Sequence, residues 1–246
     1  MKKIKILLLS LAVGCLSLFS LTQYQIVKAK GVTEAPKTSL QLSTSTFYYG
    51  QVSNGKPHGK GTMTWESTRT YTGEWKNGKR QGEGTYTGNY TREDEAYHVF
   101  YEGQWDNNQI TGKGIRTTIA STFEEGITAN TIESGTFKNG ELIEGYTVSN
   151  MLADPPYKFT YKGAGNTYIE IIDSNEGLAS SWGKGELFAV KYVKGKLVKS
   201  YSSFPSGDDK IDAQNEQTLI YLRSIEKEIL PHLKKFEALS KLIPLK

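Results

Sequence analysis

Residues 71–84 read YTGEWKNGKRQGEG, and this stretch decides the fold because its pattern occurs three times. Residues 48–61 read YYGQVSNGKPHGKG, and residues 101–114 read YEGQWDNNQITGKG. The three segments share Y-x-G-x-(W/V)-x-N-(G/N)-x-x-x-G-x-G without a gap. Two less complete copies begin at residues 133 and 188. Self-similarity of this kind is typical of a repeat protein, in which each copy forms one small structural unit.

The pattern predicts one β-hairpin in each copy. Successive side chains of a strand point to opposite faces, so Tyr71, Gly73 and Trp75 share one face and the polar residues between them share the other. Asn77-Gly78 is a strong turn signal because both residues tolerate a positive φ. The stretch therefore predicts a strand, a tight turn and a returning strand.

Two glycines open the returning strand of each good copy, as Gly82 and Gly84 do in the second copy. Glycine is otherwise unfavourable in strands, so its recurrence indicates that another group approaches the backbone closely. Both glycines of a pair point to one face. We therefore expect the space above them to hold a Tyr or Trp ring of an adjacent hairpin.

The pattern resembles the MORN repeat (membrane occupation and recognition nexus), whose hallmark is Y-x-G-x-W-x-x-G-x-x-x-G-x-G. The resemblance covers about residues 48–145, and it departs at Val52, where Trp is expected, and at Asn108, where Gly is expected. It implies an elongated, single-layer antiparallel sheet of stacked hairpins with its aromatic residues in a stripe. It also implies a scaffold or interaction surface, linked in some proteins to membrane phospholipids, and no catalysis by the repeats. The repeat-defining residues are Tyr48, Gly50, Gly55, Gly59, Gly61, Gly73, Gly78, Gly82, Gly84, Gly103, Gly112, Gly114, Gly135 and Gly140.

The rest of the chain divides by its hydrophobic pattern. Residues 30–46 are rich in Ser and Thr, and they are predicted to be a linker before the repeats at 47–147. Residues 148–205 alternate as strands do, which predicts a degenerate extension of the sheet. Apolar residues then recur at three- and four-residue steps, which predicts an amphipathic helix over 206–246.

The predicted C-terminal helix needs a partner for its apolar stripe. Pro231 is expected to kink or split the helix near Leu230. Docking of the helix on the sheet as a cap is the first expectation, because repeat arrays need capped ends. Membrane association, favoured by the lysines near the end of the chain, and binding to a helix of another protein are the alternatives. The stripe consists of Leu222, Ile225, Ile229, Leu233, Phe236, Leu239 and Ile243.

Residues 1–29 have the pattern of an export signal. Three lysines precede the uncharged run Ile6–Leu21, and Val27-Lys28-Ala29 supplies small residues at positions −3 and −1 of a cleavage site. An uncut membrane anchor is one alternative, because the segment extended to Val27 is long enough to span a bilayer. Lipidation of Cys15, the only cysteine, is another. Each places the rest of the chain outside the cytoplasm of a bacterium, either secreted or anchored at the cell surface.

Charge argues against a nucleic-acid partner. The formal net charge is +4 over 246 residues. The first 29 residues contain four lysines and no acidic residue, which leaves 26 of the 30 basic residues against 26 acidic residues. Binding to nucleic acid needs a basic surface, and this balance gives no support for one.

Residues that could carry catalytic or metal-binding chemistry are scattered along the chain. His58, His98 and His232 show no metal-ligand spacing, and no nucleophile motif is present. The carboxylate runs at 93–95 and 124–125 have the pattern of solvated loops. The sequence therefore predicts a protein that is not an enzyme and that uses no cofactor and no metal.

Aromatic residues are the candidate binding residues. Exposed rings could stack on sugars or line a groove for a partner, whereas buried rings would pack between repeats. The leading hypothesis is an extracytoplasmic scaffold that binds a protein or a cell-envelope component. A cell-wall polysaccharide-binding module and a module that binds membrane lipid remain as alternatives. The candidate residues are Tyr71, Trp75, Tyr101, Trp105 and Trp65.

Overall fold

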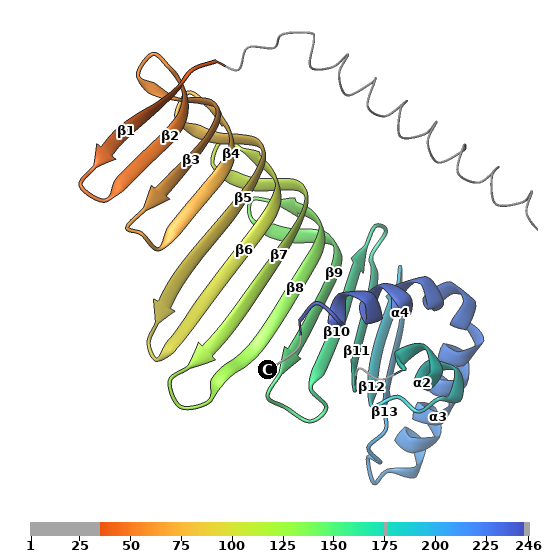
Figure 1. Ribbon diagram of the computed structural model, residues 1–246. Coiled ribbons are helices and arrows are strands. Elements are labelled where there is room, and N and C mark those ends of the chain that lie inside the picture. The colour runs from red at the N-terminus through yellow and green to blue at the C-terminus, as the bar shows by residue number, and fades with distance from the viewer. Residues whose placement is uncertain (1–34, 175–176, 244–246) are drawn as a thin grey trace, which may run out of the picture. The chain divides into compact units, whose positions relative to one another are not determined.

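The computed structural model describes residues 35–174 and 177–243 (Figure 1). In this part of the chain thirteen strands form one antiparallel sheet, and each strand pairs with the next one along the sequence. The predicted mostly β fold of stacked hairpins with C-terminal helices is therefore confirmed. The predicted export signal at 1–29 lies outside the described residues. The strands are β1 (Lys37–Ser43), β2 (Thr46–Ser53), β3 (Lys56–Trp65), β4 (Arg69–Lys76), β5 (Lys79–Arg92), β6 (Glu95–Asp106), β7 (Gln109–Thr122), β8 (Gly126–Lys138), β9 (Glu141–Met151), β10 (Tyr157–Gly163), β11 (Thr167–Asp173), β12 (Ala189–Lys194) and β13 (Leu197–Ser202).

Strand β1 lies inside the segment 30–46, which the sequence predicts to be a linker. Its Ser39 and Leu40 pair with Tyr49 and Tyr48 of β2. Nearly all residues of β1 are exposed, so its composition resembles that of a loop. A solvated edge strand and a polar linker share this composition, and only the backbone pairing distinguishes them.

Tight turns with positive φ join the hairpins, as the repeat pattern predicts. Asn77 and Gly78 have φ values of 53° and 83°. A positive φ at both central residues gives the backbone a twist that matches the flanking strands. Residues Asn54, Gly55, Asn107, Asn108, Asn139 and Gly140 repeat this conformation in the other hairpins.

Each repeat tyrosine covers the glycine pair of its own hairpin. A Cβ atom added to Gly84 would lie 2.4 Å from the Tyr71 hydroxyl oxygen, and one added to Gly61 would lie 2.2 Å from that of Tyr48. The prediction that the glycines make room for a ring is confirmed for Gly84, although the ring belongs to its own hairpin and not to an adjacent one. It is wrong for Gly82, which has a φ of 64° and lies against the Glu74 side chain. Gly73, two residues beyond Tyr71, pairs with Gly84, and a strand side chain that leans along its own strand reaches this pair first.

The two halves of the sheet bury opposite faces. In β2 to β9 the buried rings, among them Tyr71 and Trp105, lie on one face, which we call the aromatic face. From β8 onward a second cluster, including Ile132 and Phe159, lies on the opposite face. Side-chain alternation places Ile132 and its neighbour Glu133 on different faces, so the change occurs within one strand. The aromatic face of the repeats is consequently not part of the helix-covered core.

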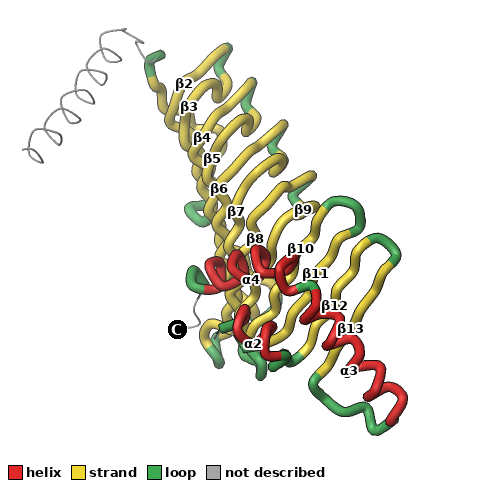
Figure 2. The backbone as a smooth tube through the Cα atoms, turned by 90° about the vertical axis from the view of Figure 1, so that its right-hand side faces the viewer, coloured by secondary structure: helices red, strands yellow, loops and turns green. Residues whose placement is uncertain are grey.

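Three helices pack on the opposite face of the last strands (Figure 2), and they are α2 (Leu178–Lys184), α3 (Asp209–Ser224) and α4 (Glu226–Ser240). The Phe236 ring of α4 lies 5.4 Å from that of Phe159 in β10. The Trp182 Nε1 of α2 donates to the Leu222 carbonyl of α3 at 3.0 Å. Docking of the C-terminal stripe on the sheet is therefore confirmed. Among the described helices, none is both long and apolar enough to cross a membrane.

The C-terminal helix divides at Ile225 and continues through Pro231, so the expected split near Leu230 is wrong. Ile225 ends α3 and precedes α4 with φ −99° and ψ 13°. Pro231 lies inside α4. Its ring removes one backbone hydrogen bond, and the burial of Ile229 and Leu233 on either side offsets that loss.

Candidate functional site

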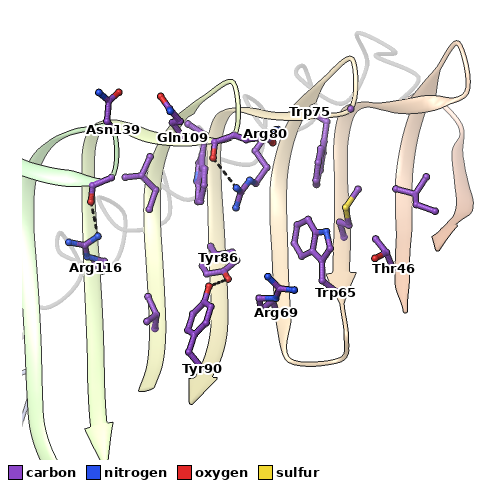
Figure 3. A pocket seen from close by; sticks show the side chains of 18 residues that line it. Thr46, Trp65, Arg69, Trp75, Arg80, Tyr86, Tyr90, Gln109, Arg116 and Asn139 are labelled. Atoms are coloured by element: carbon purple, nitrogen blue, oxygen red, sulfur yellow. Dashed lines mark hydrogen bonds between the residues drawn. The ribbon is translucent and has the colours of Figure 1, made fainter. Parts of the chain in front are cut away.

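A pocket with a volume of about 840 Å³ opens on the aromatic face of the repeats (Figure 3). We call it the aromatic-face pocket. Trp65 of β3, Trp75 of β4, Arg80 of β5, Trp105 of β6 and Ile110 of β7 contribute to its lining. Consecutive strands thus each supply side chains, because the repeat places equivalent positions beside one another. A volume of this size is typical of sites that bind small molecules or short segments of a partner.

A continuous ladder of aromatic rings forms the packed layer beneath the pocket. Neighbouring rings meet edge to face with centroids 5.0 to 5.5 Å apart, an arrangement that contributes about 0.5–1.5 kcal/mol per pair beyond the burial of area. The Trp75 and Trp105 Nε1 atoms donate to the Gly61 and Gly84 carbonyls at 2.9 and 3.2 Å. The ladder runs Tyr48, Trp75, Tyr71, Trp105, Tyr101, Phe137.

The five candidate binding residues differ in their access to the pocket. Tyr71 and Tyr101 have no exposed surface and do not line it. Trp75 and Trp105 are 3% and 4% exposed, and they line it from below. Trp65 is half-buried and also lines it. The tyrosines therefore serve packing, and a binding role for the three tryptophans stays a prediction.

The ladder tyrosines are hydrogen-bond donors and do not act as acids or bases. Burial raises the pKa of Tyr101 to about 12, and burial also raises the pKa of Tyr71. Their hydroxyls donate to the carbonyls of Gln104 at 3.2 Å and of Glu74 at 3.0 Å. Both phenols are thus protonated at neutral pH and hold the backbone of their own strands.

Arg80 projects into the pocket among aromatic rings (Figure 3). Its guanidinium carbon lies 4.2 Å from the Trp105 ring centroid and 5.8 to 5.9 Å from the centroids of Trp65, Tyr71 and Tyr86. Its NH2 group donates to the Asn108 carbonyl at 2.8 Å. Burial lowers the pKa of Arg80, and no described residue forms an ion pair with it. The side chain is held by rings and one carbonyl without a countercharge.

Two further arginines line the pocket and already have carboxylate partners. Arg116 Nε donates to Glu133 at 2.5 Å, and its NH1 group donates to the Gly140 carbonyl at 2.8 Å. Arg69 pairs with the exposed Glu66 at 2.9 Å. Of the three arginines in the lining, Arg80 is therefore the one without a carboxylate partner among the described residues, and it gives the pocket one uncompensated positive charge.

Other reactive side chains do not form a site with the pocket. Within the described ranges, no three His, Cys, Asp or Glu side chains lie close enough to hold a metal ion. The buried His58 Nδ1 has no hydrogen-bond partner, and His98 contacts Asn89 on the surface. The carboxylates at 93–95 and 124–125 lie in or beside hairpin turns.

His232 of α4 is part of a polar cluster that joins the helix to the sheet. Its Nδ1 lies 3.0 Å from the Tyr146 hydroxyl, and its ring lies 4.2 Å from that of Tyr161. One turn earlier on α4, the Glu228 carboxylate accepts from the Tyr192 hydroxyl at 2.9 Å and from Lys194 Nζ at 2.8 Å. Two ionisable side chains, His232 and Glu228, therefore take part in the docking of α4 on the sheet.

Stability is expected to fall on acidification through His232. Burial lowers the pKa of His232, although the Glu228 carboxylate opposes this shift. The unfolded chain therefore takes up the proton first, and stability decreases as the pH falls from about 7.5 to about 5, through the ordinary histidine pKa of about 6.5. Urea titrations of wild type and His232→Gln at several pH values measure the free energy of unfolding. It should depend less on pH in the variant than in wild type. His98→Gln, which changes an exposed ring, is the control; equal slopes for wild type and His232→Gln would refute the coupling.

Arg80 is one of the pocket residues that sequence reasoning missed. The repeat offered a signal, because the equivalent positions of the other copies are Pro57, Ile110 and Leu142. Pro57 and Leu142 are buried, and Ile110 is half-buried. At this position the other copies thus have a buried or half-buried apolar residue. A charged residue there indicates a role other than packing.

The fold defines a β-hairpin repeat protein with a pocket on its aromatic face. The MORN repeat family model matches residues 48–67, 71–89 and 101–118, so the chain contains three MORN repeats. Each matched segment corresponds to one hairpin: β2 with β3, β4 with β5, and β6 with β7. A comparison with curated protein sequences found no significant match. MORN repeats imply a repeat-based binding or scaffold role for this part of the chain.

Proposed function

We propose that this protein is a non-enzymatic binding scaffold that acts outside the cytoplasm. The observation that supports the proposal most is the aromatic-face pocket, which lies on the MORN repeats and away from the helix-covered core. Its floor is built from rings that pack against one another and are almost completely buried. A rigid floor of this kind favours binding because little side-chain freedom is lost when a partner arrives.

The extracytoplasmic location rests on the sequence. A basic start, an uncharged apolar run and small residues before position 30 are typical of an export signal. The export pattern is compatible with a partner that is a protein or a cell-envelope component. A sugar chain needs exposed ring faces to stack on, and the near-complete burial of Trp75 and Trp105 gives less support to that partner.

Site-specific photo-crosslinking in the producing cells tests the scaffold function. A photoreactive phenylalanine at Gln109, which is exposed at the pocket, should form a discrete covalent adduct with a partner. The same probe at Thr72, an exposed position on the opposite face of β4, is the matched control and should form little or none. Adducts of equal yield at both positions, or none at Gln109, would argue against a binding role for this face.

A further inference from the structure

Arg80 lies where an anionic ligand group would complete its environment. A guanidinium has five N–H donors, and the hydrogen bond from Arg80 to the Asn108 carbonyl uses one of them. The Trp105 ring at 4.2 Å stabilises the cation through its π face but accepts no ordinary hydrogen bond. Arg80 thus retains donors that face the pocket without a carboxylate partner among the described residues.

The contrast with the neighbouring arginines isolates Arg80 as the ligand-binding group. Arg116 is satisfied by Glu133 and by the Gly140 carbonyl, and Arg69 by Glu66. Moving a cation from water into a ring-lined pocket is unfavourable unless a partner compensates for it. A ligand carboxylate that meets Arg80 in two parallel hydrogen bonds would provide this compensation.

The surroundings of Arg80 narrow the chemistry of the ligand. Trp65, Trp75 and Ile110 line the same pocket as Arg80 and make part of its surface apolar. Side chains of neighbouring strands lie about 4.8 Å apart, so the walls extend over several residues of a bound chain. An extended polypeptide with an acidic residue between apolar residues fits both the charge and the apolar lining.

We propose that the aromatic-face pocket binds an acidic, partly apolar polypeptide segment of a partner protein, with one Glu or Asp carboxylate on Arg80. This inference rests on the proposed scaffold function and names its partner class. Arg80 is the specificity-determining residue of the pocket. Trp65 and Ile110, the half-buried apolar side chains of the lining, contact the apolar residues on either side of the acid.

A fluorescein-labelled peptide of alternating Glu and Leu residues is the probe, and fluorescence anisotropy with the full chain measures its binding. Arg80→Gln should weaken binding about tenfold or more, because a partly desolvated charge pair loses its cation. Lys79→Gln removes the same charge from the adjacent exposed residue, and it should change binding less than about twofold. Arg80→Lys keeps the charge without the bidentate geometry and should give an intermediate loss. Thermal melts of each variant establish that it is folded.

Three outcomes would overturn the inference. A matched peptide with Gln in place of Glu could bind equally well, or Arg80→Gln could bind as tightly as wild type. The protein could also bind phosphatidylglycerol vesicles and not the Glu peptide, which would assign the pocket to a lipid surface. The scaffold function is judged separately: an adduct at Gln109 that persists in Arg80→Gln leaves the scaffold in place and removes only the acidic partner.

Discussion

Gly84→Val is expected to lower the free energy of unfolding by at least about 2 kcal/mol, the scale of overpacking in a dense core. A Cβ atom at this position would lie 2.4 Å from the Tyr71 hydroxyl oxygen and 2.5 Å from two carbons of its ring. Tyr71 has no exposed surface, and its ring meets those of Trp75 and Trp105 edge to face at 5.0 and 5.2 Å. The ring cannot move aside without disturbing both neighbours, so the clash is not relieved locally.

Glu83→Val is the matched control, because Glu83 is the adjacent residue and is exposed on the opposite face of β5. Valine suits a strand, and the expected change is within about 0.5 kcal/mol. Urea denaturation followed by tryptophan fluorescence measures both variants. If the two substitutions destabilise the protein equally, the tyrosine does not occupy the space above the glycine pair.

Local sequence signals were sufficient to predict the hairpins. Asn77-Gly78 requires a turn by its backbone preferences, and the alternation from Tyr71 to Trp75 requires a strand. Both features depend only on residues close together in the chain. The single sheet of consecutive hairpins was implied by the resemblance to the MORN repeat, and it is confirmed by the strand order.

The change of buried face could not be predicted in the same way. The alternation of side chains along a strand predicts that Ile132 and Glu133 point to opposite faces of the sheet. It does not predict which face packs against a helix. That choice depends on where α4 docks, which is a contact across a long stretch of sequence. The failure to separate edge strand β1 from a linker has another cause, because a solvated edge strand and a polar linker share the same composition.

The pocket was predictable in part. Aromatic positions of the repeat indicated the residues of its floor, whereas the role of Arg80 depends on rings from β3, β4, β5 and β6 that meet only in the folded sheet. The helix division at Ile225 likewise follows from packing, because α3 contacts β13 and α4 contacts β9. The sequence instead predicted a kink or split of the helix at Pro231, because proline is unfavourable inside helices.

Phe236→Ala is expected to cost about 3–5 kcal/mol of unfolding free energy, the range for removing a large aromatic side chain from a core. Phe236 has no exposed surface, and its ring lies 5.5 Å from that of Tyr146 and 5.4 Å from that of Phe159. The substitution would leave a cavity between α4 and the sheet. Phe123→Ala, at a fully exposed ring in the turn between β7 and β8, should change stability by less than about 0.5 kcal/mol.

This pair of variants also separates the two roles considered for the C-terminal stripe. A stripe that serves as core is required for folding, so Phe236→Ala should shift the urea midpoint of the whole sheet and leave binding to anionic vesicles unchanged. A stripe that leaves the sheet to enter a membrane would instead lose vesicle binding in Phe236→Ala with little change in the midpoint. The burial of Leu233, Phe236 and Leu239 against β9 to β12 leads us to expect the first result.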